Sequence, residues 1–304
     1  MESTDTENKP NFIKQHLTTI IVVLVLLVGV GVMAYPTVSD WWNSYHQSRA
    51  ITGYAEAVNQ LSPEEYKAVW NDAKEYNKTL LNRPQTFELN EQETADYESQ
   101  LNIEGNGIMG YVEVPSINVK LPVYHGVDES NLQGAIGHIP DTSLPVGGES
   151  THCVVSGHRG LPSAMLFTDL DKVVEGDLFM FHTLNETLTY EVDQIRIVEP
   201  QDTKDITIVP GEDLATLVTC TPYGINSHRM LVRGHRVPNI SADRVVAEAE
   251  QVSPIVVAAA VGIPILFILL AAALLYTRKK NAPNAAAEAL KADIKGEPKE
   301  PKDD

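Results

Sequence analysis

The stretch TLVTCTPYGINSHRMLVR, residues 216–233, contains two strand-like segments joined by a turn. Apolar and β-prone residues fill both segments, and Pro222, Tyr223 and Gly224 between them are typical of a tight turn. Cys220 ends the first segment and is one of only two cysteines in the chain. A thiol is a strong nucleophile only as the thiolate, which nearby cations and a partner base stabilise. Because arginines follow closely, the stretch predicts a cysteine nucleophile where a strand enters a turn.

A second β-rich segment, residues 154–160, ends with a histidine between two glycines. His158 is the candidate acid and base, because a covalent acyl transfer needs one group that both donates and accepts protons. The competing histidines are His125, His138, His152 and His228. Together, a cysteine, a histidine and an arginine are the parts of a covalent acyl-transfer site.

These motifs resemble those of the sortase family. Residues 216–220 match the TLxTC signature, residues 156–161 resemble the sortase histidine segment, and the run from Cys220 to Arg229 is similar to the class C, pilus-assembling branch. The resemblance covers roughly residues 50–237. It implies an eight-stranded β-barrel with N-terminal helices, flanked by two transmembrane helices.

The resemblance also implies a reaction. Cys220 would attack the Thr carbonyl of an LPxTG-type sorting signal, and His158 would protonate the departing Gly amine. The thioester would then pass to an amine, which in a pilin polymerase is a lysine of the next subunit. Thr219 would help to shape the groove for the sorting signal.

The oxyanion formed in such a reaction needs a fixed cationic donor, and a guanidinium supplies one. Arg229, Arg233 and Arg236 are candidates. Since side chains alternate along a strand, Arg229 and Arg233 share a face and the pattern does not separate them. The family arginine lies nine residues after the cysteine in this branch, and this spacing selects Arg229.

Two uncharged apolar runs, residues 17–35 and 254–277, are each long enough to cross a bilayer. Lys9 and Lys14 precede the first run, and Arg278, Lys279 and Lys280 follow the second. The positive-inside rule therefore predicts that both termini are cytoplasmic and that the central segment is extracellular. The alternative for the first run is a cleaved signal peptide ending at Ala34, but its length favours an uncleaved signal-anchor.

This organisation predicts seven regions. They are a cytoplasmic N-terminus (1–16), a signal-anchor (17–35), membrane-proximal helices with a candidate lid (36–106), a catalytic barrel (107–240), a linker (241–253), a second span (254–277) and a disordered cytoplasmic tail (278–304).

Within the central segment, residues 37–80 show apolar residues at helical spacing, and Ser62 with Glu65 forms a capping-box signature. Residues 81–106 are polar and are expected to be irregular. Residues 163–170 are expected to form a short helix or turn. Short apolar runs with turn signals predict strands at 108–114, 119–124, 153–156, 178–182, 188–198, 206–209, 214–220 and 230–232.

Class C sortases often carry a lid with an Asp-Pro-aromatic motif, which residues 81–106 lack. Phe87, three residues after Pro84, is the candidate substitute; the alternative for this segment is a plain surface linker. Cys153 is expected to pack in the core, and a disulfide to Cys220 is disfavoured because it would block the nucleophile.

The net charge is −18, and the acidic central segment argues against nucleic acid or anionic lipid partners. No cofactor or metal is expected. The expected partners are sorting-signal proteins, a lysine or cell-wall amine, and membrane lipid around two spans. The family implies a Gram-positive organism. The alternative functions are a sortase that anchors proteins to the cell wall, an extracellular binding module that kept the barrel, and a cysteine protease that transfers the acyl group to water.

Overall fold

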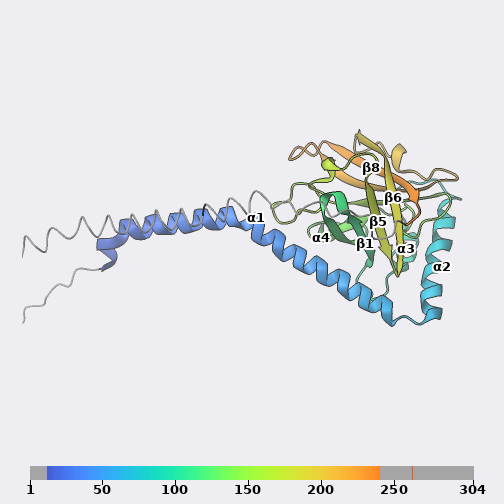
Figure 1. The fold of residues 1–304 in the computed structure, drawn as a ribbon, viewed down its shortest axis with the longest axis horizontal. Helices are drawn as coiled ribbons and strands as arrows, with labels where there is room; N and C mark the ends of the chain where they lie inside the picture. The colour runs from blue at the N-terminus through green and yellow to red at the C-terminus, as the bar shows by residue number, and fades with distance from the viewer. Residues whose placement is uncertain (1–11, 240–261, 263–304) are drawn as a thin grey trace, which may run out of the picture. The chain divides into compact units, whose positions relative to one another are not determined.

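The β-rich half of the chain closes into a barrel (Figure 1), and the computed structural model describes residues 12–239 and residue 262. The strands of this barrel are β1 (Ile108–Val114), β2 (Val119–His125), β3 (Ile136–His138), β4 (Thr151–Ser156), β5 (Leu178–Thr183), β6 (Glu186–Val198), β7 (Asp213–Thr221) and β8 (His228–Val237). The predicted eight-stranded β-barrel is therefore confirmed.

The strand order around the closed barrel is β1-β2-β3-β4-β7-β8-β6-β5, and β5 pairs again with β1. The pairs β2–β3 and β4–β7 are parallel, and all the other pairs are antiparallel. The parallel β4–β7 pair joins two strands that are far apart in the sequence. This pair brings the histidine segment beside the cysteine segment.

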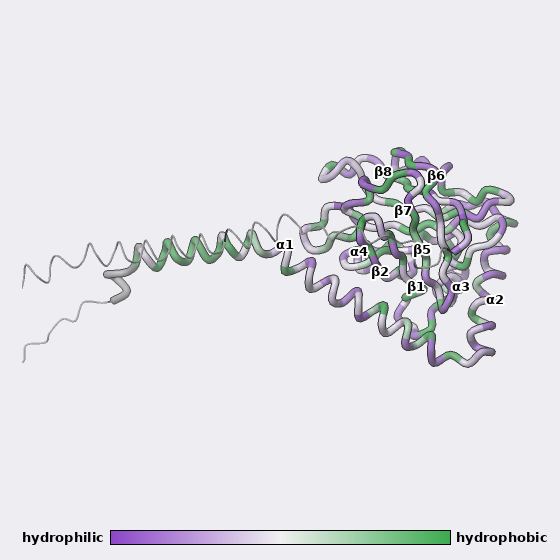
Figure 2. The backbone as a smooth tube through the Cα atoms, viewed as in Figure 1, coloured by the Kyte–Doolittle hydropathy of each residue, from purple (hydrophilic) through white to green (hydrophobic). Residues whose placement is uncertain are grey.

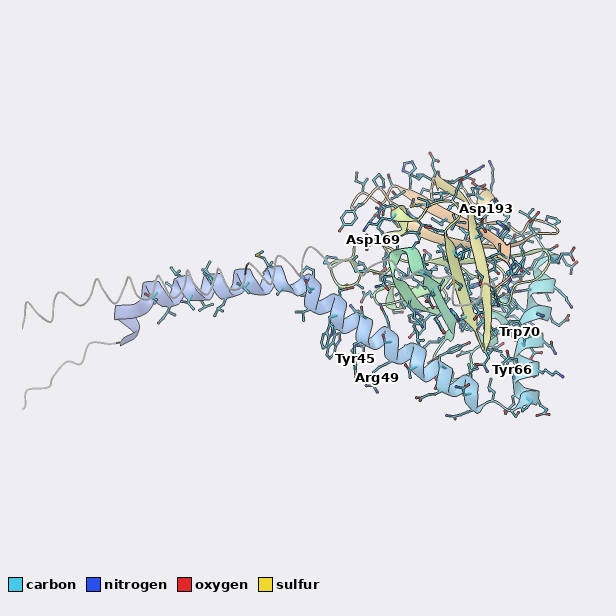
Figure 3. The ribbon with its side chains drawn as sticks, viewed as in Figure 1. Tyr45, Arg49, Tyr66, Trp70, Asp169 and Asp193 are labelled. Atoms are coloured by element: carbon cyan, nitrogen blue, oxygen red, sulfur yellow. The ribbon has the colours of Figure 1, made fainter. Side chains whose placement is uncertain are left out.

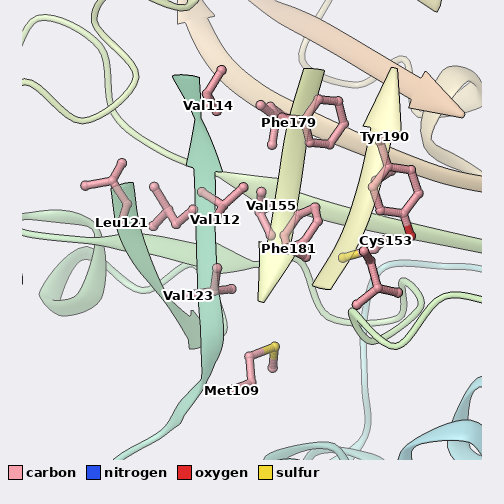
Figure 4. Close-up of a cluster of buried hydrophobic side chains, with 14 of the residues drawn as sticks. Met109, Val112, Val114, Leu121, Val123, Cys153, Val155, Phe179, Phe181 and Tyr190 are labelled. Carbon is pink, nitrogen blue, oxygen red and sulfur yellow. The ribbon is translucent and has the colours of Figure 1, made fainter. Parts of the chain in front are cut away.

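Side-chain alternation along the strands separates two apolar clusters. The interior of the barrel is closely packed around Phe179, Phe181 and Tyr190, with Cys153 and Val155 beside them (Figure 4). A smaller cluster lies on the other face of the same wall and consists of Val154, Ile206, Val218 and Leu231. We call it the outer cluster, and all of its members except Val154 line the site described below as an apolar floor.

Four α-helices accompany the barrel: α1 (Phe12–Gln60), α2 (Pro63–Leu80), α3 (Glu91–Ser99) and α4 (Glu129–Leu132). Three short 3-10 turns complete the elements: η1 (Pro115–Ile117), η2 (Leu170–Lys172) and η3 (Lys204–Ile206). The α2 helix begins as predicted, because the Ser62 hydroxyl accepts from Glu65 N–H while the Glu65 carboxylate accepts from Ser62 N–H.

One helix in the described part of the chain, within α1, is long and apolar enough to cross a membrane by its length and composition. Figure 2 shows that the first part of α1 is almost continuously hydrophobic, whereas hydrophobic and hydrophilic residues alternate along its second part. The helix is unbroken from the apolar run to Gln60, although separate elements were expected. The predicted second span, 254–277, lies outside the described residues.

Three local predictions were wrong. Residues 206–209 do not form a strand: η3 ends at Ile206, and Ile208 N–H bonds to the Gln85 side chain instead of a neighbouring strand. Strand β3 was missed, because three residues are too few for a visible alternation. The segment 81–106 is not wholly irregular, because Asn90 and Glu93 form a capping box that starts α3.

Residues 163–170 form turns followed by η2, as expected of a short helix or turn.

Candidate active site

The three predicted catalytic side chains come from one barrel wall: Cys220 and Arg229 from the paired strands β7 and β8, and His158 from the turn that follows β4. Cys220 lies opposite Arg229 in the antiparallel β7–β8 register. Side chains directly opposite in such a pair have their Cβ atoms about 5 Å apart. On the other side of β7, the parallel β4–β7 register pairs Ser156 with Val218, and His158 and Cys220 each follow two residues later.

The turn that carries His158 is fixed to β7 by two hydrogen bonds. Gly157 N–H donates to Val218 C=O at 3.0 Å, and the Thr219 hydroxyl donates to Gly157 C=O at 2.8 Å. A side chain at Gly157 would collide with Ile136 and Phe167, so the close approach requires glycine. Thr219 is buried and does not line the cavity, and it contacts this turn instead.

A cavity of about 320 Å³ opens on the outer face of this wall. The three candidate residues are neighbours in its lining, and we call this part its reactive end. Three members of the outer cluster, Ile206, Val218 and Leu231, also line it and form its apolar floor. Its complete lining is Val127, Leu132, Ile139, Ser156, Gly157, His158, Val198, Glu199, Pro200, Asp202, Thr203, Ile206, Val218, Cys220, Arg229 and Leu231. The cavity therefore joins a reactive end to an apolar surface.

The arginines differ in their partners. Arg229 is half-buried and donates from Nη1 only to the backbone carbonyls of Asn226 and His228, each at 3.2 Å. Arg233 instead holds Asp193 through two hydrogen bonds of 3.0 and 2.9 Å. Arg236 approaches Asp213 at 4.0 Å. Of the three, only Arg229 lines the cavity, and it makes no ion pair with the described residues.

One carboxylate that the sequence did not indicate lies beside His158. Glu129, at the start of α4, places Oε2 3.5 Å from His158 Nε2, which is itself buried and makes no hydrogen bond with the described residues. No signal in the sequence marks Glu129, because it reaches the site through the α4 turn, far from both motifs.

A second contact ties the histidine turn to the cysteine turn. The Arg159 guanidinium pairs with Asp171, lies 3.5 Å from the Thr221 hydroxyl, and stacks 6.0 Å from the centre of the Tyr223 ring. Gly160 has a φ of +77°, and a Cβ there would meet the Tyr223 ring at 2.8 Å. The two turns thus pack directly on each other.

The competing histidines have other environments. His138 and His152 are buried, and burial lowers the pKa of each to about 4. His125 is buried by the segment around Gln100 and Gly107, and burial lowers its pKa as well. His228 bonds to the neighbouring Ser227 hydroxyl. None of these four lines the cavity.

The two cysteines are both free thiols. Cys153 is 2% exposed inside the barrel, and burial raises its pKa well above the usual value. Cys220 is partly exposed and lines the cavity. The structure thus separates a packed thiol from an accessible one.

Phe87 packs against the outer cluster but does not line the cavity. Its segment is fixed by the buried Asp141, whose carboxylate accepts from Thr86 N–H at 2.7 Å, Phe87 N–H at 3.0 Å and the Arg83 guanidinium at 2.7 Å. Phe87 therefore lies over the edge of the apolar floor, away from the nucleophile.

Comparison with known proteins gives a consistent result. The model of the sortase domain family matches residues 112–237. The crystal structure of sortase C1 from Streptococcus agalactiae is 55% identical, with a TM-score of 0.62, and the match covers 63% of this chain and all of that one.

Two further relatives extend the comparison. A structure of Clostridium perfringens sortase C with the C-terminal cell wall sorting motif is 41% identical, with a TM-score of 0.56, over 63% of this chain and 100% of that chain. Sortase A of Bacillus anthracis is 23% identical over 74% of this chain and 96% of its own length.

Proposed function

Because this chain belongs to the sortase family, whose members are cysteine transpeptidases, we propose that it is a class C enzyme that cleaves LPxTG-type sorting signals and transfers them to a pilin lysine. One observation carries the proposal: Cys220, His158 and Arg229 line the reactive end of a single cavity. The 55% identity to a sortase C1 supports the choice of class.

In the first step, the Cys220 sulfur attacks the Thr carbonyl carbon of the sorting signal. Arg229 stabilises the oxyanion, and it is available for this because no carboxylate between residues 12 and 239 pairs with it. The bond between the Thr carbonyl carbon and the Gly nitrogen breaks, and His158 carries the proton of the Cys220 thiol to the departing amine. The product is a thioester on Cys220 and a free Gly amine.

The apolar floor suits the Leu and Pro side chains of such a signal. Val218, Leu231 and Ile206 lie next to the reactive end, and their burial of an apolar peptide would add binding energy. A related sortase C has been solved with a cell wall sorting motif, which supports a substrate of this class. Thr219 acts on this groove indirectly, through the turn of His158.

In the second step, a lysine amine attacks the thioester carbon, His158 accepts its proton, and an isopeptide bond forms while the Cys220 thiol is regenerated. Glu129, Glu199 and Asp202 stand at or beside the cavity. Their charge favours a cationic acceptor over an anionic one. No cofactor takes part in this scheme.

We propose that α1 anchors the enzyme, with the catalytic barrel outside the cell and a second anchor at 254–277. An enzyme and a substrate held in one membrane meet at a raised effective concentration. Phe87 is the proposed lid residue, and its position beside the apolar floor lets it limit access to that end.

Mass spectrometry of the full chain with an LPxTG peptide tests the reaction. We expect an acyl adduct on Cys220 that passes to one lysine of an added pilin domain, and no adduct in Cys220→Ala. Transfer to a cell-wall amine alone would support the anchoring alternative, and release to water with either amine present would support a protease. A thiol that is free but never acylated would favour the binding-module alternative.

A further inference from the structure

Beyond its apolar run, helix α1 has one face that docks on the barrel. Asp40 accepts from Met165 N–H at 2.8 Å, Asn43 donates to Ser163 C=O at 2.7 Å, and Gln47 donates to Gly134 C=O at 2.8 Å. Further along, the buried Tyr54 hydroxyl bonds to Met109 C=O and Leu184 N–H. These contacts follow a single helical face.

The opposite face carries large apolar side chains that no residue of the described part of the chain covers. Since each residue turns the helix by about 100°, Val38, Trp41, Trp42 and Tyr45 all point away from the docked face. They are 60%, 65%, 57% and 49% exposed. We call these four residues the aromatic stripe. Figure 3 shows Tyr45, with Arg49 beyond it, on the side of α1 that faces away from the barrel.

The aromatic stripe continues the apolar run of the same helix. Exposed apolar side chains extend from Leu17 to Met33, and the stripe begins a few residues later. At a rise of about 1.5 Å per residue, Val38 and Tyr45 lie about 6 and 17 Å past Ala34. A headgroup layer is about 5–8 Å thick, and membrane helices tilt by up to about 40°, so only the backbone at the start of the stripe lies within it. The Trp41, Trp42 and Tyr45 side chains reach back toward it, because helical side chains point toward the helix N-terminus.

The chemistry of the stripe fits a lipid headgroup layer. Trp and Tyr favour the membrane–water interface, where an apolar ring and a polar N–H or O–H are both satisfied. The nearest carboxylate on the helix, Asp40, is turned toward the barrel and bonded there. At the outer end of the stripe, the Arg49 guanidinium lies over the Tyr45 ring.

We propose that the aromatic stripe lies in the headgroup layer of the membrane and that α1 thereby holds the catalytic cleft at a set height and rotation above the bilayer. The inference rests on the membrane anchoring proposed above. It goes further because it assigns a lipid-binding surface to residues outside the apolar run.

The docked face links this surface to the cleft. Ser163 and Met165 follow the turn that carries His158, and Gly134 follows α4, which carries Glu129. The same helix thus contacts the lipid on one side and the loops beside the cleft on the other. A shift of α1 relative to the membrane would move these loops with it.

Tryptophan fluorescence of the full chain in lipid vesicles tests the proposal, because the chain has three tryptophans. Trp70→Phe leaves Trp41 and Trp42 as the reporters. The vesicles contain lipids brominated either near the headgroup or near the chain end. The matched control is Trp41→Phe with Trp42→Phe, which leaves Trp70, a partly buried residue of α2.

We expect shallow bromines to remove most of the Trp41 and Trp42 emission, deep bromines to remove less, and both to leave Trp70 unchanged. Co-flotation with the vesicles reports anchoring separately. If the chain floats with the vesicles but only an aqueous quencher affects Trp41 and Trp42, the headgroup location of the stripe is refuted. The membrane anchoring by α1 is not. A chain that does not float would refute both, and shielding that depends on protein concentration would indicate a second copy and also refute the lipid assignment.

Discussion

The two thiols of this chain occupy opposite extremes of environment. Cys153 is packed in the barrel interior with a raised pKa, whereas Cys220 lies at the cavity between His158 and Arg229. A thiol must be both accessible and ionised to react. The surroundings of each thiol, more than its residue type, therefore set its reactivity.

We expect iodoacetamide to alkylate Cys220 at least about 100-fold faster than Cys153 in the folded protein, because burial removes both access and thiolate from Cys153. Peptide mapping over time measures both rates. Cys153→Ala should leave the fast phase intact, and Cys220→Ala should remove it. Equal rates in the native protein would contradict the packing of Cys153.

The surroundings of Arg229 and Arg233 also differ, because Arg229 lines the cavity whereas Arg233 is paired with Asp193. Arg229→Ala should lower kcat/KM for a sorting-signal peptide by about 10²–10³, as the loss of an oxyanion donor does elsewhere. Arg233→Ala, the matched control, loses a pair with Asp193 and should cost less than about tenfold. A larger loss for Arg233→Ala would reassign the oxyanion role.

At the level of the elements, the segment between α2 and α3 depends on one buried carboxylate. Asp141 accepts from two successive backbone N–H groups and from Arg83, so its charge is what fixes Thr86 and Phe87 over the outer cluster. Hydrogen bonds to a charged group are each worth about 1.5–3 kcal/mol. Local unfolding of the segment with Thr86 and Phe87 therefore has a high free-energy cost while the Asp141 carboxylate is present.

Asp141→Asn should speed amide exchange at Thr86 and Phe87 by about 30-fold, which corresponds to a loss of about 2 kcal/mol. Hydrogen exchange with residue resolution measures this. Glu93→Gln is the control, because it removes the charge of the more exposed partner of Arg83, while Gln can still accept from Asn90 N–H in the capping box of α3. If exchange at both amides is unchanged in Asp141→Asn, the fixation has another source.

Continuity of α1 leads to a prediction about the height of the cleft. An insertion of about seven residues after Pro36 adds about two turns and raises the barrel by about 10 Å without rotating it much. In vesicles, we expect slower processing of membrane-anchored sorting signals and unchanged processing of a soluble peptide. Equal loss for both substrates would indicate a folding defect instead.

For the molecule as a whole, two buried neutral histidines link stability to pH. His152 Nδ1 bonds to Thr207 C=O and Nε2 to the Thr216 hydroxyl, and His138 contacts Ser143 C=O and the Tyr97 hydroxyl in the same manner. In each histidine, one ring nitrogen can donate to the carbonyl while the other accepts from the hydroxyl. This is the hydrogen-bonding pattern of a neutral imidazole. Burial lowers the pKa of each from 6.5 to about 4, which keeps both rings neutral at neutral pH.

Because these pKa values are lower in the folded than in the unfolded state, the unfolded chain binds more protons below pH 6.5. Stability should be full above that pH and fall as the pH drops to about 4, by about 3 kcal/mol for each histidine. Urea unfolding at a series of pH values measures the slope. His152→Gln should flatten it, and an equal slope in that variant would contradict the assignment.

The sequence alone was sufficient for features encoded over a few residues. Short apolar runs with turn signals predicted seven of the eight strands, the Ser62 capping box predicted the start of α2, and the TLxTC and histidine motifs indicated the family. Such features depend on residues that are close in the sequence, so a single sequence is enough to predict them.

The arrangement of the site residues depends on contacts between segments that are far apart in the sequence. The parallel β4–β7 pair brings His158 beside Cys220, Asp193 occupies Arg233 and leaves Arg229 at the cavity, and α4 brings Glu129 to His158. Each contact joins segments whose separation in sequence carries no local signal. The sequence by itself therefore determined the parts of the site and the barrel. The tertiary structure determined which charges pair with one another and which face of α1 docks on the barrel, because burial and pairing exist only once distant segments meet.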